Sequence, residues 1–331
     1  MNCPLDFETP LFELTQKVLS LRNQSMALDL SQEDAKLQYN DIIEEICALE
    51  LKMEELTQET YANLSIWQRV QLSRHPDRPH AKEFIYELCP DFHELHGDRC
   101  FSDDAAIIGG IGTFKDIPIV IIGIEKGQNT NDKIHHNFGM PKPDGYRKAL
   151  RLMKLADQFN LPIITLIDTP GAYPGIQAEE RGQGQAIAEN IAQMFDIKSP
   201  IMAIVIGEGG SGGALALAIA DKVFMLEYSI YSVISPESCA SILWSDASKA
   251  QLAANALALY PQKALDLQVI DAIIPEPFGG AHRNHAQCFN ILKEFLNIEL
   301  EKLLQLKSEE LIQTRFEKFR KMGNQTIITR E

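Results

Sequence analysis

The chain has 331 residues, of which 45% are hydrophobic, enough to bury a sizeable core in one large domain or two small ones. Its formal net charge of -15 argues against wholesale binding to nucleic acid or to a membrane surface, so an anionic ligand must meet a local basic patch. No apolar run is long enough to span a bilayer, and residues 1–9 lack the pattern of a signal peptide, so we expect a cytoplasmic protein.

Residues 1–75 predict amphipathic helices. Apolar residues recur at helical spacing between Leu11 and Leu21 and again between Leu37 and Met53, with a polar break at 29–34. The second stretch is highly charged between its apolar positions, as in a long amphipathic helix. Because an uncovered apolar stripe of this length is costly, the helices either pack on the body or, as we favour, dock to a partner subunit.

A proline-rich segment, 75–79, marks the entry to a main domain that we place at residues 76–290. We interpret His75 and His80 as surface residues of this linker. Four further side chains match no usual metal-ligand spacing and are interpreted as a polar loop: His93, His96, Asp98 and Asp104.

From residue 105 short apolar strands alternate with glycine-rich turns, which predicts an α/β fold. The strands expected first are 105–111, 117–124, 161–167 and 201–206. A helix over 145–159 carries basic residues on its predicted outward face, among them Arg147, Lys148 and Arg151. This cluster is either a solvated face or a site for phosphates or an acidic partner.

Two glycine-rich loops follow successive strands, at 168–175 and 207–213. In a parallel sheet both loops emerge at the same edge, which is where ligands bind. Glycine allows positive φ and leaves no Cβ to block a close ligand. The expected substrate-binding positions in these loops are Gly171, Ala172, Gly175, Gly209 and Gly210.

Three templates fit the second loop. The dinucleotide fingerprint G-x-G-x-x-G is disfavoured, because it lies late in the chain and its crossover to the next strand is short. A nucleophile elbow would make Ser211 the nucleophile of a serine hydrolase, with His282 downstream, and it remains the runner-up. The third template is an oxyanion hole formed by the backbone amides of Gly212 and Gly213 at a helix start.

From Phe289 to about Lys321 apolar residues again recur at helical spacing, and we treat 291–331 as a helical tail. Six cysteines occur without a C-x-x-C pair, which favours free thiols and no metal site in this chain.

The ordered motifs, with the amino-terminal helices, resemble the carboxyltransferase alpha-subunit family of bacterial acetyl-CoA carboxylase. The segments that carry the resemblance are 137–141, 145–149, 167–175, 179–183, 207–214, 231–237 and 274–283. It implies the crotonase-like (ClpP/crotonase) fold, a spiral of ββα units. It also implies transfer of a carboxyl group from carboxybiotin to acetyl-CoA, giving malonyl-CoA for fatty-acid synthesis.

The same resemblance implies partners. These are a zinc-ribbon beta subunit in an α2β2 heterotetramer, a biotin carboxyl carrier protein that holds the biotin, and biotin carboxylase within an ATP-binding complex. Gly212 and Gly213 fall on the family's oxyanion-hole glycines. The base would be the biotin nitrogen, which agrees with the lack of a convincing acid–base pair, and the zinc would belong to the beta subunit.

Overall fold

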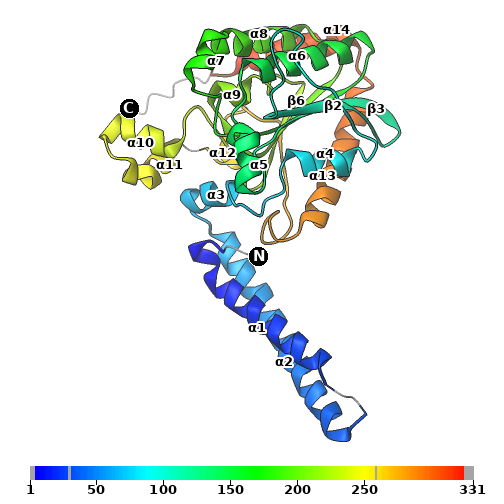
Figure 1. Ribbon diagram of the computed structural model, residues 1–331, viewed down its shortest axis with the longest axis vertical. Helices are drawn as coiled ribbons and strands as arrows, with labels where there is room; N and C mark the ends of the chain where they lie inside the picture. The colour runs from blue at the N-terminus through cyan, green and yellow to red at the C-terminus, as the bar shows by residue number, and fades with distance from the viewer. Residues whose placement is uncertain (1–3, 29–30, 258, 324–331) are drawn as a thin grey trace, which may run out of the picture.

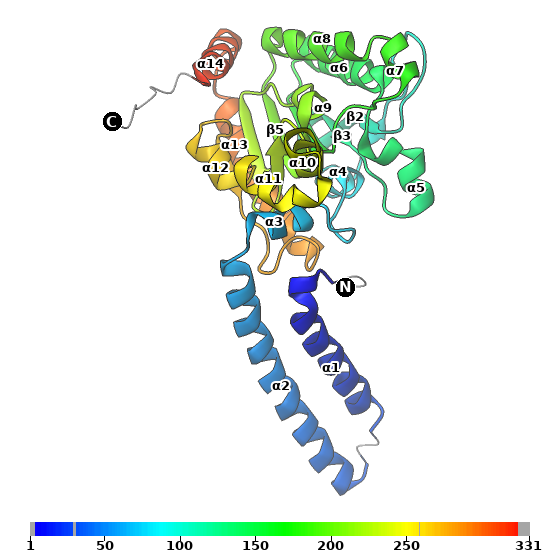
Figure 2. The same cartoon turned by 90° about the vertical axis from the view of Figure 1, so that its left-hand side faces the viewer.

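Two long helices at the start of the chain form a hairpin that projects from the rest of the molecule (Figures 1 and 2). The computed structural model describes residues 4–28, 31–257 and 259–323. After a short 3-10 turn, η1 (Asp6–Glu8), helix α1 spans Thr9–Met26 and helix α2 spans Glu33–Ala62.

The hairpin is held by its own apolar seam and by two ion pairs. The buried seam consists of Val18 and Leu21 of α1 with Ile42 and Ile46 of α2. Lys17 pairs with Glu45, and Arg22 pairs with Glu50. Each helix therefore covers the apolar stripe of the other, a possibility that the sequence analysis did not consider.

Eight strands in the described residues form one mixed sheet in the order β1-β2-β3-β4-β5-β6-β8, with β7 paired to β5. The strands are β1 (His93–Glu94), β2 (Ile107–Phe114), β3 (Ile117–Ile124), β4 (Ile163–Thr169), β5 (Ile201–Gly210), β6 (Lys222–Leu226), β7 (Ile230–Ser232) and β8 (Ala272–Ile274). Strands β1, β2 and β3 pair antiparallel, and all later pairs are parallel. The carboxyl ends of β3, β4 and β5 therefore share one edge.

Helices bury both faces of the sheet. Helix α4 (Ala81–Leu88) and helix α13 (His285–Leu303) contribute to the core on one face. Helix α6 (Pro143–Gln158), helix α8 (Gln183–Asp196) and helix α9 (Ser211–Leu215) contribute to the core on the other. Because both faces of the sheet are buried, the sequences of the parallel strands are continuously apolar and do not alternate between apolar and polar residues.

The remaining described helices lie around this body. They are α3 (Ile66–Ser73), α5 (Thr130–His135), η2 (Asn137–Gly139), α7 (Ile176–Glu180), α10 (Pro236–Trp244), η3 (Ala247–Lys249), α11 (Ala250–Leu257), α12 (Pro261–Asp266) and α14 (Ser308–Lys321). None of the described helices is long and apolar enough to cross a membrane. Ser235 caps α10 by accepting a hydrogen bond from the amide of Ser238, as its position before Pro236 predicts.

The helices after residue 290 are part of the main core. The predicted division at 290 falls inside α13, whose Leu292 and Leu296 are fully buried against the sheet. In α14 the fully buried Arg315 pairs with Asp221 at 2.8 Å and donates to the carbonyl oxygens of Met194 and Ile197. Residues 291–323 thus complete the body rather than trail from it, and 324–331 lie outside the described residues.

Candidate functional site

The carboxyl ends of three neighbouring strands bring three charged side chains together. Lys126 follows β3, Asp168 lies near the end of β4, and Glu208 lies near the end of β5. The Lys126 ammonium is 2.7 Å from Asp168 Oδ1 and 3.2 Å from Glu208 Oε2. The amide of Glu208 also donates to Asp168 Oδ1 at 2.8 Å. This cluster fixes the relative positions of the three strand ends.

The cluster holds permanent charges rather than a poised base. Burial raises the pKa of the Asp168 carboxyl, but Lys126 and His80 outweigh burial and hold that pKa well below its usual range. Burial lowers the pKa of Lys126, but Asp168 and Glu208 outweigh it and raise that pKa. At neutral pH neither group accepts or releases a proton readily, so the cluster stabilises the site without acid–base chemistry.

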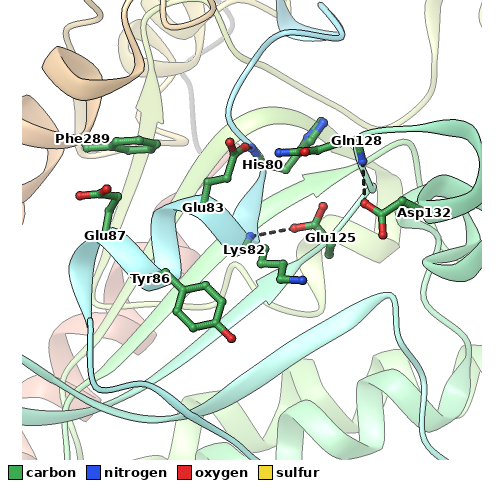
Figure 3. A pocket seen from close by; sticks show the side chains of 9 residues that line it. All are labelled: His80, Lys82, Glu83, Tyr86, Glu87, Glu125, Gln128, Asp132 and Phe289. Carbon is green, nitrogen blue, oxygen red and sulfur yellow. Dashed lines mark hydrogen bonds between the residues drawn. The ribbon is translucent and has the colours of Figure 1, made fainter.

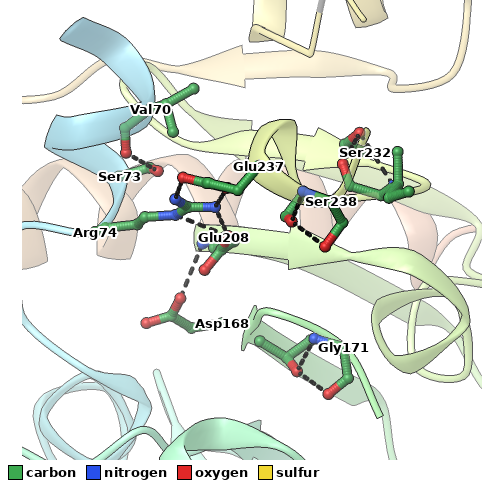
Figure 4. A network of polar contacts seen from close by, with 12 residues as sticks. Val70, Ser73, Arg74, Asp168, Gly171, Glu208, Ser232, Glu237 and Ser238 are labelled. Carbon is green, nitrogen blue, oxygen red and sulfur yellow. Dashed lines mark hydrogen bonds and ion pairs between the residues drawn. The ribbon is translucent and has the colours of Figure 1, made fainter. Parts of the chain in front are cut away.

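An arginine extends this network to two other elements (Figure 4). Arg74, which follows α3, donates to Glu208 Oε1 from Nε at 2.9 Å and from Nη2 at 2.6 Å. Its Nη1 donates to Glu237 of α10 at 2.7 Å. No sequence motif predicted a role for Arg74, Lys126, Glu208 or Glu237. For Lys126 and Glu208 the available signal was a charged residue two positions beyond the end of a predicted strand, whereas Arg74 and Glu237 lie beside or in helices and offered no such signal.

The two glycine-rich loops touch, as predicted. A Cβ on Gly213 would lie 2.6 Å from the Ala172 nitrogen and 2.7 Å from the Gly171 carbonyl carbon. A Cβ on Gly210 would lie 2.2 Å from the Pro170 carbonyl oxygen. Because these neighbours are backbone atoms that cannot move aside, only glycine permits this approach.

The glycines extend β5 to Gly210, beyond the predicted end at Ile206, because β7 pairs with Glu208, Gly209 and Gly210. Helix α9 then begins at Ser211, three residues before the alanine- and leucine-rich run that starts at Ala214. Gly212 and Gly213 occupy its second and third positions, so their amide N–H groups have no acceptor within the helix. Beside them lies a cavity of about 510 Å³ whose lining includes Ser211, Gly212 and apolar side chains of β7, α11 and α12.

The hydrolase and dinucleotide templates find no support. Ser211 is exposed and has a φ of 55°, as a nucleophile elbow would, but its predicted partner lies elsewhere. His282 is buried with its Nε2 2.9 Å from Glu8 Oε1. Glu227 lies at the spacing at which the dinucleotide fingerprint expects an acid that binds the ribose, and here its carboxylate accepts a hydrogen bond from the amide of Glu276.

The predicted basic face of α6 binds the protein's own loop. The expectation that Lys148 points outward is wrong, because this side chain is fully buried, 2.6 Å from Asp103 Oδ1 and 2.9 Å from the Asp104 carbonyl. Arg147 pairs with Asp98 and Asp144, and Arg151 donates to the Gly97 and His96 carbonyls. These three cations are thus already paired, mainly with acidic side chains and backbone carbonyl groups of residues 96–104.

His75 and His80 are buried, so the prediction that they lie on the surface is also wrong. One cluster in the described residues has the spacing of a metal site: its potential ligand atoms, from Glu8, His75 and His282, all lie within 4.8 Å of one another. However, the Asp77 amide donates to Nδ1 of His75 at 3.1 Å. The neutral ring must then carry its proton on Nε2, which leaves no lone pair toward Glu8 for a metal ion. The group acts instead as a hydrogen-bonded anchor for the start of the hairpin.

Comparisons with known proteins identify relatives of this chain. A family model described as acetyl co-enzyme A carboxylase carboxyltransferase-like matches residues 4–323. The chain is 51% identical over 319 residues to the acetyl-coenzyme A carboxylase carboxyl transferase subunit alpha of Methylococcus capsulatus, covering 96% of both chains. It is 50% identical to the same-named protein of Geobacter metallireducens, covering 96% of this chain and 97% of that one.

Solved structures show the fold. The chain is similar to transcarboxylase 12S with a TM-score of 0.52 at 18% identity, covering 66% of this chain and 42% of that one. It is similar to the geranyl-CoA carboxylase beta subunit of P. aeruginosa with a TM-score of 0.55 at 15% identity, covering 75% and 46%. These neighbours are carboxyltransferases of the crotonase-like fold, which confirms the predicted fold class.

Proposed function

The chain belongs to the family of acetyl-CoA carboxylase carboxyltransferase alpha subunits, and we propose that the Gly212 and Gly213 amides are its main contribution to catalysis. The reaction is carboxyl transfer to acetyl-CoA. The biotin-bearing carrier protein supplies both the carboxyl group and, through the biotin nitrogen, the base. The residues of this chain hold the oxygen on which negative charge develops.

The observation that supports this role is the contact between the two glycine loops. At Gly213 the chain passes within van der Waals distance of the Gly171–Ala172 peptide, so the start of α9 is fixed against the end of β4. Two N–H groups without an acceptor in the helix then lie at adjacent positions on this support. A preorganised donor of this kind stabilises a transition-state oxyanion by about 3 kcal/mol. The oxygen is either the ureido oxygen of biotin or the thioester oxygen of acetyl-CoA.

The charged cluster at the strand ends provides no side-chain base, which supports a role for the backbone amides. Lys126 and Arg74 pair with Asp168 and Glu208, and the pKa of the Asp168 carboxyl lies well below its usual range, so Asp168 is not poised to remove a proton from a substrate at neutral pH. A base from the cofactor fits this site, whereas a serine hydrolase would need a histidine near Ser211. Gly209 and Gly210 are buried within β5 and shape the loop, while Gly171, Ala172 and Gly175 are partly exposed and border the substrate.

A partner subunit is proposed to complete the site. Val233, which lines the cavity next to Gly212, is 78% exposed, and Ile242 of α10 is 73% exposed. Leu243, Leu252 and Trp244 extend this surface over α10 and α11. An apolar surface of this extent beside a half-open site fits the beta subunit of an α2β2 assembly, which would carry the zinc ribbon. The five described cysteines are free, which fits the cytoplasm.

Transcarboxylation from malonyl-CoA to a soluble biotin derivative tests the proposal. It is measured with this chain alone, with the beta subunit alone and with both. We expect activity only in the mixture. Gly213→Val should abolish it by displacing the 171–172 peptide, whereas Ser211→Ala should retain most of it. Loss of activity in Ser211→Ala with assembly intact would restore the hydrolase, and an inactive but stable wild-type complex would refute the assignment.

A further inference from the structure

A second cleft, of about 430 Å³, lies between α4, the loop after β3, α5 and the start of α13 (Figure 3). It shares no lining residue with the cavity beside Gly212. Four carboxylates line it, against the single ammonium group of Lys82. They belong to Glu83, Glu87, Glu125 and Asp132.

Glu125 is the buried carboxylate of this cleft, with 2% of its surface exposed. Its two oxygens accept the amide N–H groups of Lys82 and Gly127, each at 2.7 Å. It makes no ion pair with any cation in the described residues. Buried carboxylates are almost always paired with a cation, and two amide bonds use only part of the acceptor capacity of a carboxylate. Glu125 is therefore a buried carboxylate that is stabilised by two amides, one of them in the first turn of α4, but has no cation as partner in the described residues and keeps acceptor capacity for a ligand.

His80 offers a second acceptor. The side chain is 6% exposed, and neither ring nitrogen makes a hydrogen bond with a described group. Its Nδ1 lies 3.6 Å from Asp168 Oδ2. In the neutral ring the proton belongs on Nδ1, facing this carboxylate, which leaves the Nε2 lone pair unused.

Glu125 and His80 are suited to a ligand that donates several hydrogen bonds and carries a positive charge. Aromatic rings of Tyr86 and Phe289 also line the cleft, and aromatic faces attract organic cations. Among the described residues, the only group of three metal-ligating side chains close enough to share one ion is Glu8, His75 and His282. A single metal ion therefore does not fit here, whereas the spread N–H groups of a planar guanidinium do.

We propose that this cleft binds an organic cation, a guanidinium or alkylammonium group, which donates hydrogen bonds to Glu125 and His80. The group belongs either to a diffusible small molecule or to an arginine or lysine side chain of a partner subunit. Binding of this cation does not depend on the carboxyltransferase reaction, because it can be measured without following that reaction.

Calorimetric titration of the purified full-length chain with agmatine, which carries a guanidinium and an ammonium group, tests the proposal. Hexane-1,6-diol serves as a neutral control of similar length. We expect agmatine to bind with an affinity that falls as salt is raised, and we expect the diol not to bind. Absence of binding at millimolar agmatine, or equal binding of the diol, would overturn the proposal.

Variants locate the site. Glu125→Gln should weaken agmatine binding by about tenfold or more, since it removes the buried charge. Tyr86→Leu, at an exposed ring, should weaken binding by about threefold and keeps the test valid if Glu125→Gln does not fold. Glu310→Gln, an exposed carboxylate on α14, is the matched control and should bind as the wild type does. Equal weakening in all three variants would show non-specific attraction to an acidic protein and would overturn the site.

Titration of the assembled complex with its beta subunit distinguishes the two sources of the cation. If agmatine binds both the free chain and the complex, the natural ligand is diffusible. If it binds the free chain but not the complex, a side chain of the partner occupies the cleft.

Discussion

At the scale of single residues, the site depends on buried charges that neutralise one another. Lys126 lies between two carboxylates from neighbouring strands, and Arg74 bridges one of these carboxylates to α10. Removing one member of such a buried group leaves another charge without compensation, which costs more than the pair contributes when intact.

Lys126→Met should therefore lower the free energy of unfolding by about 3–5 kcal/mol, because Asp168 and Glu208 remain buried without their shared cation. Urea denaturation of the isolated chain measures the change. Lys154→Met, at an exposed position on the same chain, should change stability by less than about 0.5 kcal/mol. Equal stabilities of Lys126→Met and the wild type would mean that the cluster is solvated.

At the scale of elements, one carboxylate anchors the projecting hairpin to the body. Glu8 lies just before α1, accepts a hydrogen bond from Tyr61 of α2, and meets His282 and His75 of the body. Burial raises the pKa of Glu8, but the hydrogen bonds to His282 and Tyr61 outweigh burial and lower it from 4.5 to about 2.

This pKa shift predicts how stability depends on pH. Because the pKa of Glu8 is lower in the folded state, its contribution is fully present above about pH 4.5 and is lost as the pH falls toward 2. Wild type should exceed Glu8→Gln in unfolding free energy by on the order of 3 kcal/mol at pH 6, and the difference should shrink on acidification. Urea titrations at several pH values measure it. A difference that stays constant would contradict the shift, and exposed Glu33→Gln should show none.

The sequence predicted these elements better than it predicted their surroundings. The strands and long helices follow from apolar runs and helical periodicity, and the contact of the two loops follows from parallel topology. Lys148, His75 and His80 were misplaced because their burial depends on partners distant in sequence: Asp103, Glu8 and Asp168. The far end of β5 was missed because its glycines are ordered by pairing with β7, which local propensity does not report.

At the scale of the whole molecule, the exposed apolar surface over α10 and α11 is the docking surface proposed for the partner. Ile242→Asp, at a 73% exposed position, should leave the chain folded but prevent its association with the beta subunit, since a charge would be buried in the interface. Sedimentation of the mixture measures association, and circular dichroism checks the fold.

Phe159→Asp is the matched control, because this exposed ring lies at the end of α6, away from α10. It should associate as the wild type does. Normal association of Ile242→Asp would place the partner on another surface, and the projecting hairpin would then be the next region to test.

The buried Arg315 has a consequence for how the chain matures. This residue of α14 is the counter-ion of Asp221, which directly precedes β6. It also donates hydrogen bonds to backbone carbonyl oxygens at the end of α8. In a chain without α14, Asp221 would be buried without its cation, so this part of the body reaches its full stability only when α14 packs against it. We therefore expect chains in which α14 has not yet packed to be cleaved by proteases more readily than fully folded ones.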